Sequence, residues 1–436
     1  MAAAPGILLF SGDGLYLLYT VLVSLGFVLA LPVYLWKGRA TGKYLATFRE
    51  RMGRLPDGIA STGPSIWIHA VSVGEVLAAR VLVRPLKRAF PDHRVFISTT
   101  TMTGQAVARA SAHGADGLFY APFDWPGPVR HALAALRPRL LLLVETELWP
   151  NLIHEARRYG ARVAVVNGRI SDRSFGRYRL ARFFLRRVLA EVDLLLMQTD
   201  EYARRVVEIG APPGRVRVVG NLKYDALEPP EVPEGLARLL SGAGGGPLCV
   251  AGSTVAGEEE RVLAAFRLVH DAFPGARLVI APRHPERFDE VPPRVEAAGF
   301  RCARRTRLGD QPWREAEVLL LDTIGELARV YPAATVVFVG GSLVPAGGHN
   351  VLEPAVAGRA VVVGPHMENF QEIAETFLAE GALVQVASED GLAAALLDLL
   401  RDPGRREEIG RRARALVERN RGALDATLDA LGRLVA

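Results

Sequence analysis

The sequence predicts an α/β protein with two doubly wound, Rossmann-like domains that follow an N-terminal membrane-anchor helix. Three observations lead to this class. Short apolar runs alternate with amphipathic stretches, as in parallel sheets covered on both faces. The alternation stops at the proline-rich segment EPPEVPEG (228–235) and then starts again. A run without charged residues, from Gly14 to Trp36, precedes both halves and is long enough to span a bilayer.

The composition of the 436-residue chain is that of a globular protein with a sizeable core. Half of the residues are apolar and 23% are charged, which excludes intrinsic disorder and fibrous repeats. The two cysteines, Cys249 and Cys302, lie outside any CxxC motif and form neither a disulfide framework nor a zinc site. Because the nine histidines include no HExxH pair, we expect no metal and no cofactor.

The apolar run 14–36 has aromatic residues toward both ends and is followed at once by Lys37, Arg39 and Lys43. Positive charges mark the cytoplasmic flank of a membrane anchor, so the rest of the chain is expected in the cytoplasm. A signal peptide would carry its charges before the apolar run, and a buried core helix is the other alternative. We expect an uncleaved anchor over residues 1–36, spanning or partly inserted, with membrane lipids as partners.

Six apolar runs predict the strands of a first domain over 37–227: 65–71, 95–100, 140–145, 162–167, 193–198 and 215–220. Five more predict a second domain over 236–436, whose last helix is free to cross back to the first domain: 248–253, 277–282, 317–323, 335–340 and 360–365. The linker is expected at 228–235. The two domains are expected to face a cleft, with ligands at the carboxyl ends of the strands.

The first candidate residue follows the strand expected at 65–71. Ser72 and Glu75 have the spacing of a capping box, in which Glu75 bonds back to the backbone at Ser72. The functional alternative places the Glu75 carboxylate at a strand-to-helix crossing, ready to accept a proton. Gly74 beside it lets a substrate approach closely. The spacing leaves both interpretations open.

Two more charged residues follow strands of the first half. Glu145 closes an apolar run in ETELWPN (145–151), where a buried carboxylate is costly without a partner. It either caps the next helix or points into the cleft. Lys223 follows the strand expected at 215–220 and supplies a cation just before the linker. Taken alone, such a lysine is typical of a solvated surface.

The second half has four weak signals of a nucleotide site. Arg283 follows a strand and offers a guanidinium to a phosphate. Gly252-Ser253-Thr254 follows another strand and is expected to open a helix whose free N–H groups favour an anion. Glycines at 340–342 and 347–350 permit close backbone approach, although such loops are often ordinary turns. Glu353 is placed to bind ribose hydroxyls.

Positive charge is concentrated in the arginine segment, residues 169–187, which holds seven arginines and one aspartate for a net charge of +6. Residues 37–57 carry a further net charge of +4, so the rest of the chain, whose total is +6, sums to −4. Aromatic residues between the arginines favour contact with anionic lipid, either bilayer headgroups or the phosphates of a lipid ligand. A solvated basic helix is the alternative.

Six motifs together closely resemble the Kdo transferases of lipopolysaccharide synthesis, which are membrane-anchored glycosyltransferases of the GT-B type. The motifs are IHAVSVGE (68–75), ETELWPN (145–151), GNLKYD (220–225), PRHPERF (282–288), DTIGEL (322–327) and GGHNVLEPA (347–355). The resemblance extends from the anchor to about residue 400, and the final helical stretch carries no diagnostic motif.

The resemblance implies transfer of 3-deoxy-D-manno-oct-2-ulosonic acid (Kdo) from CMP-Kdo to a lipid A precursor, lipid IVA, with inversion and without a metal. It also implies attachment to the inner membrane, whose lipids are then partners. By motif, Glu75 corresponds to the general base on the acceptor hydroxyl. Glu145 and Lys223 correspond to residues that support the transition state. The expected donor contacts, with Ser253 and Thr254 added from their place after a strand, are Pro282, Arg283, Thr323, Ile324, Gly325, Asn350, Val351, Leu352 and Glu353.

Two other classes stay open. Another GT-B enzyme that uses a UDP-linked sugar, or an epimerase of that fold, has the same architecture. A non-catalytic, membrane-tethered module that binds polyanions through the arginine segment is the second alternative. Nucleic acid is not expected as a partner, because an anchor holds this segment beside the bilayer.

Overall fold

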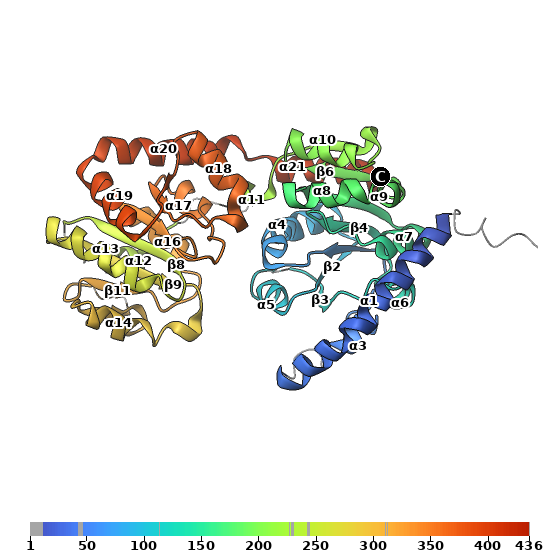
Figure 1. Ribbon diagram of the computed structural model, residues 1–436, viewed down its shortest axis with the longest axis horizontal. Helices are drawn as coiled ribbons and strands as arrows, with labels where there is room; N and C mark the ends of the chain where they lie inside the picture. Colours follow the sequence, from blue (N-terminus) through green and yellow to red (C-terminus); the bar gives the residue numbers. More distant parts are fainter. Residues whose placement is uncertain are drawn as a thin grey trace, which may run out of the picture. The chain divides into compact units, whose positions relative to one another are not determined.

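The computed structural model describes residues 12–41, 47–112, 114–225, 227, 231–241, 245–309, 311 and 313–435. The chain divides into two compact units, Met1–Ala226 with Arg421–Ala436 and Leu227–Asn420. It therefore passes between the units twice. The first passage lies beside the predicted linker 228–235, of which residues 228–230 fall outside the described part. Figure 1 labels the elements of each unit.

The described residues of the first unit form a parallel sheet of seven strands in the order β3-β2-β1-β4-β5-β6-β7. The strand order reverses between β1 and β4, as in other doubly wound sheets. The strands are β1 (Ser65–His69), β2 (Arg94–Thr99), β3 (Gly117–Tyr120), β4 (Pro138–Val144), β5 (Arg162–Gly168), β6 (Leu194–Met197) and β7 (Val216–Val218).

Helices cover both faces of this sheet, because alternate strand residues enter two separate cores. Trp67 of β1 packs with α6, α7 and α9, whereas Ile66 and Ile68 pack with α4 and the C-terminal helix α21. The helices of this unit are α1 (Gly12–Thr41), α3 (Phe48–Arg51), α4 (Val73–Ala89), α5 (Met102–Ser111), α6 (Pro126–Leu136), α7 (Pro150–Tyr159), α8 (Asp172–Leu180), α9 (Arg182–Ala190), α10 (Asp200–Glu208), α11 (Leu222–Asp225) and α21 (Ala423–Val435).

Helix α21 returns to the first unit and is fastened there by Asp225. The two carboxylate oxygens of Asp225 accept from the backbone N–H groups of Gly422 at 2.8 Å and Leu424 at 3.0 Å. These groups belong to the first turn of α21, whose N–H groups have no partner within the helix. Buried Ala430 and Leu431 then pack into the core beside α4.

Helix α1 has 30 residues and contains a stretch, Gly14–Leu31, that is long and apolar enough to cross a membrane. It is a candidate anchor. It continues past the predicted boundary at Trp36 as far as Thr41, so Lys37 and Arg39 lie on its last turns, while Lys43 is outside the described residues.

The second unit contains another parallel sheet, whose seven described strands run in the order β10-β11-β9-β8-β12-β13-β14. They are β8 (Leu248–Thr254), β9 (Arg277–Pro282), β10 (Cys302–Arg304), β11 (Val318–Leu320), β12 (Val336–Val339), β13 (Val361–Val363) and β14 (Val384–Gln385). The helices are α12 (Glu234–Ser241), α13 (Glu259–Ala272), α14 (Val291–Ala297), α15 (Arg305–Leu308), α16 (Leu327–Val330), α17 (Leu352–Val356), α18 (Gln371–Ala379), α19 (Glu389–Arg401) and α20 (Pro403–Arg419).

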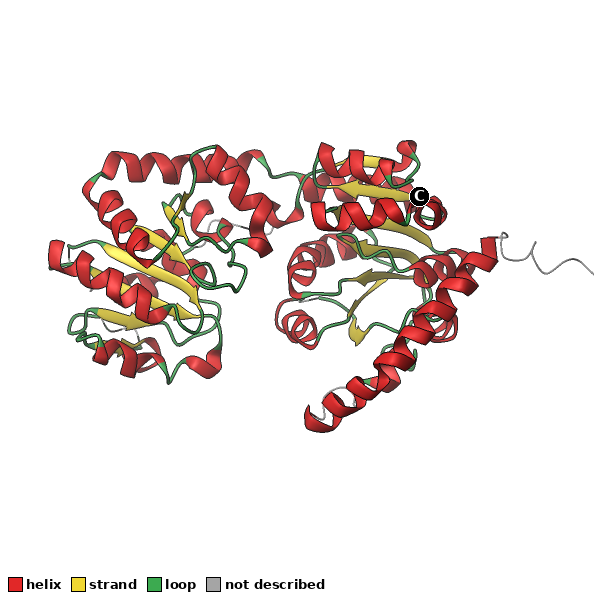
Figure 2. Cartoon of the chain, viewed as in Figure 1, coloured by secondary structure: helices red, strands yellow, loops and turns green. Residues whose placement is uncertain are grey.

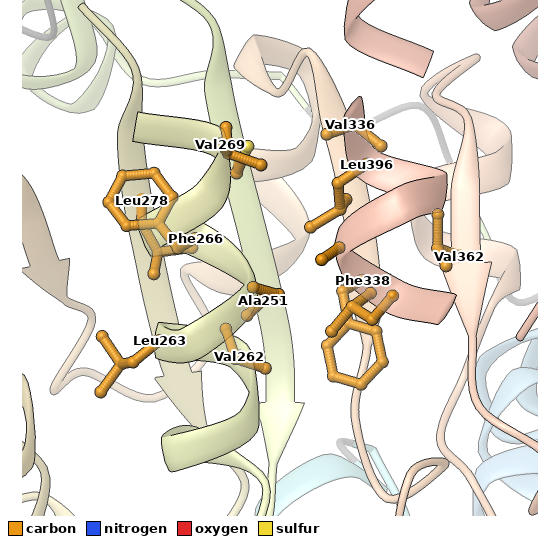
Figure 3. Close-up of a cluster of buried hydrophobic side chains, with 14 of the residues drawn as sticks. Ala251, Val262, Leu263, Phe266, Val269, Leu278, Val336, Phe338, Val362 and Leu396 are labelled. Atoms are coloured by element: carbon orange, nitrogen blue, oxygen red, sulfur yellow. The ribbon is translucent and has the colours of Figure 1, made fainter. Parts of the chain in front are cut away.

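The core of the second unit lies between this sheet and the helices α13 and α19. Figure 3 shows Phe266 of α13 beside Leu278 of β9, and Leu396 of α19 above Phe338 of β12. All four side chains are buried. The packing follows from the sequence, because apolar residues recur along one face of each helix and along every strand.

The predicted fold class is confirmed: two doubly wound α/β units follow an apolar N-terminal helix (Figure 2). Three strands were missed, namely β3, β10 and β14, and all three lie at sheet edges. Edge strands are short and less apolar than central ones, so they give a weak periodic signal. The final helix α21 belongs to the first unit.

Candidate active site

The carboxyl ends of β1 and β4 carry the two glutamates that we predict to be catalytic. These strands are neighbours where the order of the first sheet reverses. Ligands of doubly wound sheets bind beside such a reversal. Glu75 lies in the first turn of α4, shortly after β1, and Glu145 is the first residue after β4.

The carboxylate of Glu75 is held by local hydrogen bonds, and the residue is 5% exposed. Its oxygens accept from the backbone N–H of Val71 at 2.7 Å and from the hydroxyl of Ser72 at 2.6 Å. Ser72 is the N-cap residue of α4, but its hydroxyl accepts no capping bond, so the reciprocal capping box is not formed. Burial, followed by the charge of Glu147, raises the pKa of Glu75 to about 8.

Glu145 contacts two cations, Arg169 directly after β5 and Lys223 in α11, which follows β7. Its Oε1 accepts from Nζ of Lys223 at 3.1 Å, and its Oε2 lies 3.9 Å from Nη1 of Arg169. The backbone φ of Glu145 is +59°, a strained conformation for a residue with a side chain. Strain of this kind is concentrated at functional sites.

The alternative in which Glu145 caps the next helix is wrong. The first turn of α7 is capped by Asp124, whose carboxylate accepts from the N–H groups of Asn151 at 3.2 Å and Leu152 at 2.7 Å. Glu145 instead pairs with Lys223.

Lys223 is held in place by a buried polar network that the sequence did not reveal. The N–H of Leu222 donates to Oδ1 of Asn167 at 3.0 Å. The amide of Gln198 donates to the carbonyl of Asn167 at 2.8 Å and accepts from Asn221 at 3.1 Å. Asn167 also has a positive φ of +55°. These hydrogen bonds join residues at the ends of β5, β6 and β7 and so hold the backbone around Lys223 in place.

A third carboxylate, Glu147, belongs to the same site and was also missed. Trp149 donates its indole N–H to Glu147 at 2.8 Å, and its ring meets that of His69 edge-on, with centroids 4.6 Å apart. Burial raises the pKa of Glu147 and lowers the pKa of His69 to about 3, so the imidazole is neutral. The motif ETELWPN could have indicated this residue, because Glu147 stands two residues after Glu145.

In the second unit, Pro282 and Arg283 stand at the carboxyl end of β9. Pro282 is buried, whereas Arg283 is exposed and donates its backbone N–H to the carbonyl of Thr254 at 2.9 Å. Burial, followed by the charge of Arg283, lowers the pKa of His349 to about 4. A neutral imidazole therefore lies within the field of an exposed guanidinium, an arrangement suited to an anion.

Asn350 and Glu353 are brought together at the start of α17. The side-chain amide of Asn350 donates to Oε1 of Glu353 at 3.1 Å, and its Oδ1 accepts from the N–H of Leu352 at 3.1 Å. The side chains of Val351 and Leu352 are buried. These two residues can offer a ligand only their backbone groups.

Thr323, Ile324 and Gly325 form a turn after β11. The hydroxyl of Thr323 donates to Glu326 at 2.5 Å, and Arg305 binds the same carboxylate at 3.0 and 3.1 Å. Ile324 is 82% exposed, and Gly325 has a φ of +87° with open space around it. An apolar side chain thus stands exposed at a strand end of the second sheet.

The prediction that Ser253 and Thr254 open a helix is wrong. Both residues belong to β8, and α13 begins only at Glu259. The side chain of Thr254 is fully buried and donates to Glu259 at 2.9 Å, which Arg287 binds at 2.6 and 3.0 Å. The sequence pattern was misleading because a turn of four residues separates the strand from the helix.

The glycine-rich loop at 340–342 approaches an internal carboxylate. The N–H groups of Gly341, Ser342 and Leu343 donate to the buried carboxylate of Glu258 at 2.6, 3.0 and 2.9 Å. This loop follows β12, next to β8, where the order of the second sheet reverses. Its backbone donors are therefore occupied by the protein itself.

Among the described residues, no group of three or more His, Cys, Asp or Glu side chains is arranged to hold a metal ion. The two free cysteines also lie apart, Cys249 buried in β8 and Cys302 half-buried in β10.

The architecture of the two units first defines the structural class of the protein. The putative UDP-N-acetylglucosamine 2-epimerase from Listeria monocytogenes has the same fold, with a TM-score of 0.57 and 14% identity over 85% of this chain and 96% of that chain. Two Rossmann-like units of this type constitute the GT-B fold. The C-terminal CMP-Kdo binding domain of WaaA from Acinetobacter baumannii is 32% identical, covering 42% of this chain and 95% of that chain, with a TM-score of 0.39.

Sequence comparison then gives the family. Residues 46–226 match the family described as 3-Deoxy-D-manno-octulosonic-acid transferase (kdotransferase). The 3-deoxy-D-manno-octulosonic acid transferase of Bordetella pertussis is 36% identical over 419 residues, which are 92% of this chain and 96% of that protein. The chain belongs to the family of Kdo transferases, which confirms the resemblance seen in its motifs.

Proposed function

We propose that this protein transfers Kdo from CMP-Kdo to a lipid A precursor, lipid IVA, with inversion, and that Glu75 is the general base. The observation that supports the proposal best is the buried Glu75 carboxylate beside the Glu145–Lys223 pair at the switch of the first sheet. A pKa of about 8 leaves about one tenth of Glu75 ionised at pH 7 and makes that fraction a stronger base than an ordinary carboxylate.

In this mechanism, Glu75 takes the proton from the acceptor hydroxyl as that oxygen attacks the anomeric carbon of Kdo. The bond from that carbon to the CMP phosphate breaks, and CMP leaves as a phosphate monoester. Lys223 and Glu145 support the transition state from the neighbouring strand ends. Glu145 already pairs with Lys223, which holds the ammonium group in one position.

The donor site is proposed in the second unit. Arg283 neutralises the departing phosphate, and Glu353, oriented by Asn350, accepts from ribose hydroxyls. Pro282, Thr323, Ile324, Gly325 and the backbone of Val351 and Leu352 complete the CMP contacts. Ser253 remains a candidate, whereas Thr254 can contribute only through its backbone, because its hydroxyl is bound to Glu259.

We also propose that α1 attaches the protein to the inner membrane, with both units on the cytoplasmic side. The apolar stretch Gly14–Leu31 supports this attachment. A lipid acceptor and a cytoplasmic nucleotide donor meet only at that surface.

The substitution Glu75→Gln tests the base. The amide keeps the size of the side chain and still accepts from Val71, but it cannot take up a proton. We expect Kdo transfer to fall by at least about 100-fold, while CMP binding stays unchanged. The product is measured by mass analysis after incubation with CMP-Kdo and the lipid A precursor, which also counts the sugars added.

Two further variants accompany this experiment: one is a control for transfer, and the other tests the donor site. Glu208→Gln, on the exposed side of α10, should leave transfer unchanged. Arg283→Ala should weaken CMP binding, measured as loss of thermal stabilisation by CMP. Normal transfer by Glu75→Gln would instead favour a purely local bonding role for Glu75, and stabilisation by UDP rather than CMP would favour a UDP-sugar enzyme.

A further inference from the structure

Helix α1 has one face that contacts the first unit. With about 100° between successive residues, Tyr16, Thr20 and Phe27 lie on the same side of the helix. The ring of Tyr16 stacks on that of His154 with centroids 4.0 Å apart. Phe27 meets Trp125 edge-on at 5.0 Å. This face therefore packs along the first unit for more than three turns.

Two polar contacts fix this docking. The hydroxyl of Tyr19 donates to Asp124 at 2.9 Å, and the amide of Asn151 donates to the hydroxyl of Thr20 at 2.9 Å. Asp124 and Asn151 are buried and belong to the cap of α7. Figure 1 shows α1 running past α7 and α6. Helix α1 is thus part of the first unit.

The opposite face of α1 is apolar and exposed. Its residues are centred about 180° away from the docked face. They are 45–80% exposed, and none is charged: Leu17, Leu18, Val21, Leu22, Leu25, Val28 and Leu29. A continuous apolar surface of this kind is costly in water and marks an interaction site.

The docked segment is too long for α1 to span a bilayer. From Tyr16 to Phe27 the helix rises about 16 Å, and only about 13 Å of uncharged helix follows, up to Trp36. A hydrocarbon core is about 30 Å thick. Spanning would therefore draw Asp124, Asn151 and their surroundings into hydrocarbon, which is unfavourable for polar groups.

The arginine segment contacts α1 next to the exposed face, since Tyr19 lies only about 60° around the helix from Leu22. Phe184 of α9 stacks on Tyr19 with centroids 5.6 Å apart. The neighbouring residues Leu180 and Phe183 are 89% and 65% exposed. The exposed guanidinium groups around them form no ion pair with any carboxylate in the described part of the chain: Arg177, Arg179, Arg182 and Arg186. Apolar side chains bordered by unpaired arginines fit the surface of an anionic bilayer.

We propose that α1 is an interfacial helix, which lies in the plane of the cytoplasmic leaflet and, together with Leu180, Phe183 and the four exposed arginines, forms one docking surface for anionic lipid. The proposal rests on the cytoplasmic location of the proposed Kdo transfer. It places the start of α1 on the same side of the membrane as both units.

The side of the membrane is tested in sealed, inverted inner-membrane vesicles that contain the full-length protein with an epitope tag at either end. Protease is added outside, where the cytoplasmic face is exposed. We expect both tags to be cleaved at the same rate. An N-terminal tag that is protected until detergent is added would show that α1 spans the membrane and would overturn the proposal.

The lipid surface is tested by sedimentation with phosphatidylglycerol vesicles. Leu25→Glu combined with Leu29→Glu should weaken binding by more than about tenfold. The matched control is Leu268→Glu on α13 of the second unit, where the leucine is 52% exposed, and it should bind normally. Arg179→Glu with Arg182→Glu should weaken binding to phosphatidylglycerol but leave the weaker binding to phosphatidylcholine unchanged.

Other results would contradict the proposal. If the leucine variants change the oligomeric state but not vesicle binding, the apolar face covers a second copy of the chain. Kdo transfer is measured for every variant with acceptor dispersed in detergent. If the wild-type protein shows no Kdo transfer in detergent, the proposed function is refuted, but the topology result still stands. If the N-terminal tag is protected, only the interfacial helix is refuted.

Discussion

Glu75 and Glu147 follow neighbouring strands; Glu75 is buried, Glu147 is half-buried, and the charge of Glu147 hinders the ionisation of Glu75. Burial is the main cause of the raised pKa of Glu75, and the charge of Glu147 is the next. The folded state therefore favours the protonated form of Glu75. Its contribution to stability is present at low pH and is lost as the pH rises from the ordinary carboxyl range through about 8.

The substitution Glu147→Gln should shift the pH dependence of Kdo transfer. If Glu75 must be ionised to act, kcat/KM of the wild-type protein rises with pH through about 8. Removing the charge of Glu147 lowers the pKa of Glu75, so the same rise should occur at lower pH. Trp149 can still donate to the carbonyl oxygen of the glutamine.

This prediction is checked by rate measurements between pH 5 and 9 with Glu208→Gln as control. A rise at the same pH in both variants would show that the charge of Glu147 does not act on Glu75. No rise at all in the wild-type protein would argue against Glu75 as the base.

The residues of the site could be predicted only where a motif marked them. Glu75, Glu145 and Lys223 each follow a recognisable strand, and the structure places them at one edge of one sheet. Asn167 and Gln198, which fix Lys223, are single polar residues at strand ends without a spacing signal. Arg169 was assigned to a lipid surface with its segment, but it lies 3.9 Å from Glu145.

At the level of elements, the central strands were predicted, whereas three of the four described edge strands were not. The most informative wrong prediction concerns the turn between β8 and α13, where we expected Ser253 and Thr254 to open a helix. Glu258, in this turn, reaches the loop after β12 and accepts four backbone hydrogen bonds, including one from Val255 at 3.0 Å. A glycine-rich sequence alone does not tell whether its N–H groups bind a ligand or a carboxylate of the same chain.

The substitution Glu258→Ala should destabilise the second unit strongly. It leaves the N–H groups of Gly341, Ser342 and Leu343 without their acceptor, and each unpaired buried donor costs about 1–3 kcal/mol. We expect a loss of at least about 3 kcal/mol, measured by thermal or chemical unfolding.

The control for this element is Glu260→Ala, two residues further along α13. Its carboxylate is half exposed and pairs with Arg294, so removal should cost about 0–1 kcal/mol. Equal stability of the two variants would show that water replaces the carboxylate of Glu258 without cost.

At the level of the whole molecule, the core of the first unit includes the C-terminal helix α21. A variant that ends at Asn420 lacks α21 and uncovers the side of α4 against which Leu431 packs. We expect faster hydrogen exchange in α4 and α11, unchanged exchange in α13 and α19, and loss of most Kdo transfer. Exchange in α4 at the normal rate would show that the first unit is complete without α21.

The return of α21 also sets the order in which the protein can mature during translation. The second unit is continuous in sequence, from Leu227 to Asn420, and can fold as soon as it has left the ribosome. The first unit is begun earlier but lacks the last piece of its core until residues 423–435 emerge. At about 5–20 residues per second, the intervening chain takes roughly 10–40 s to synthesise. A nascent or prematurely terminated chain therefore lacks part of the core that supports the helix of the proposed base, and we expect it to be inactive until α21 has docked.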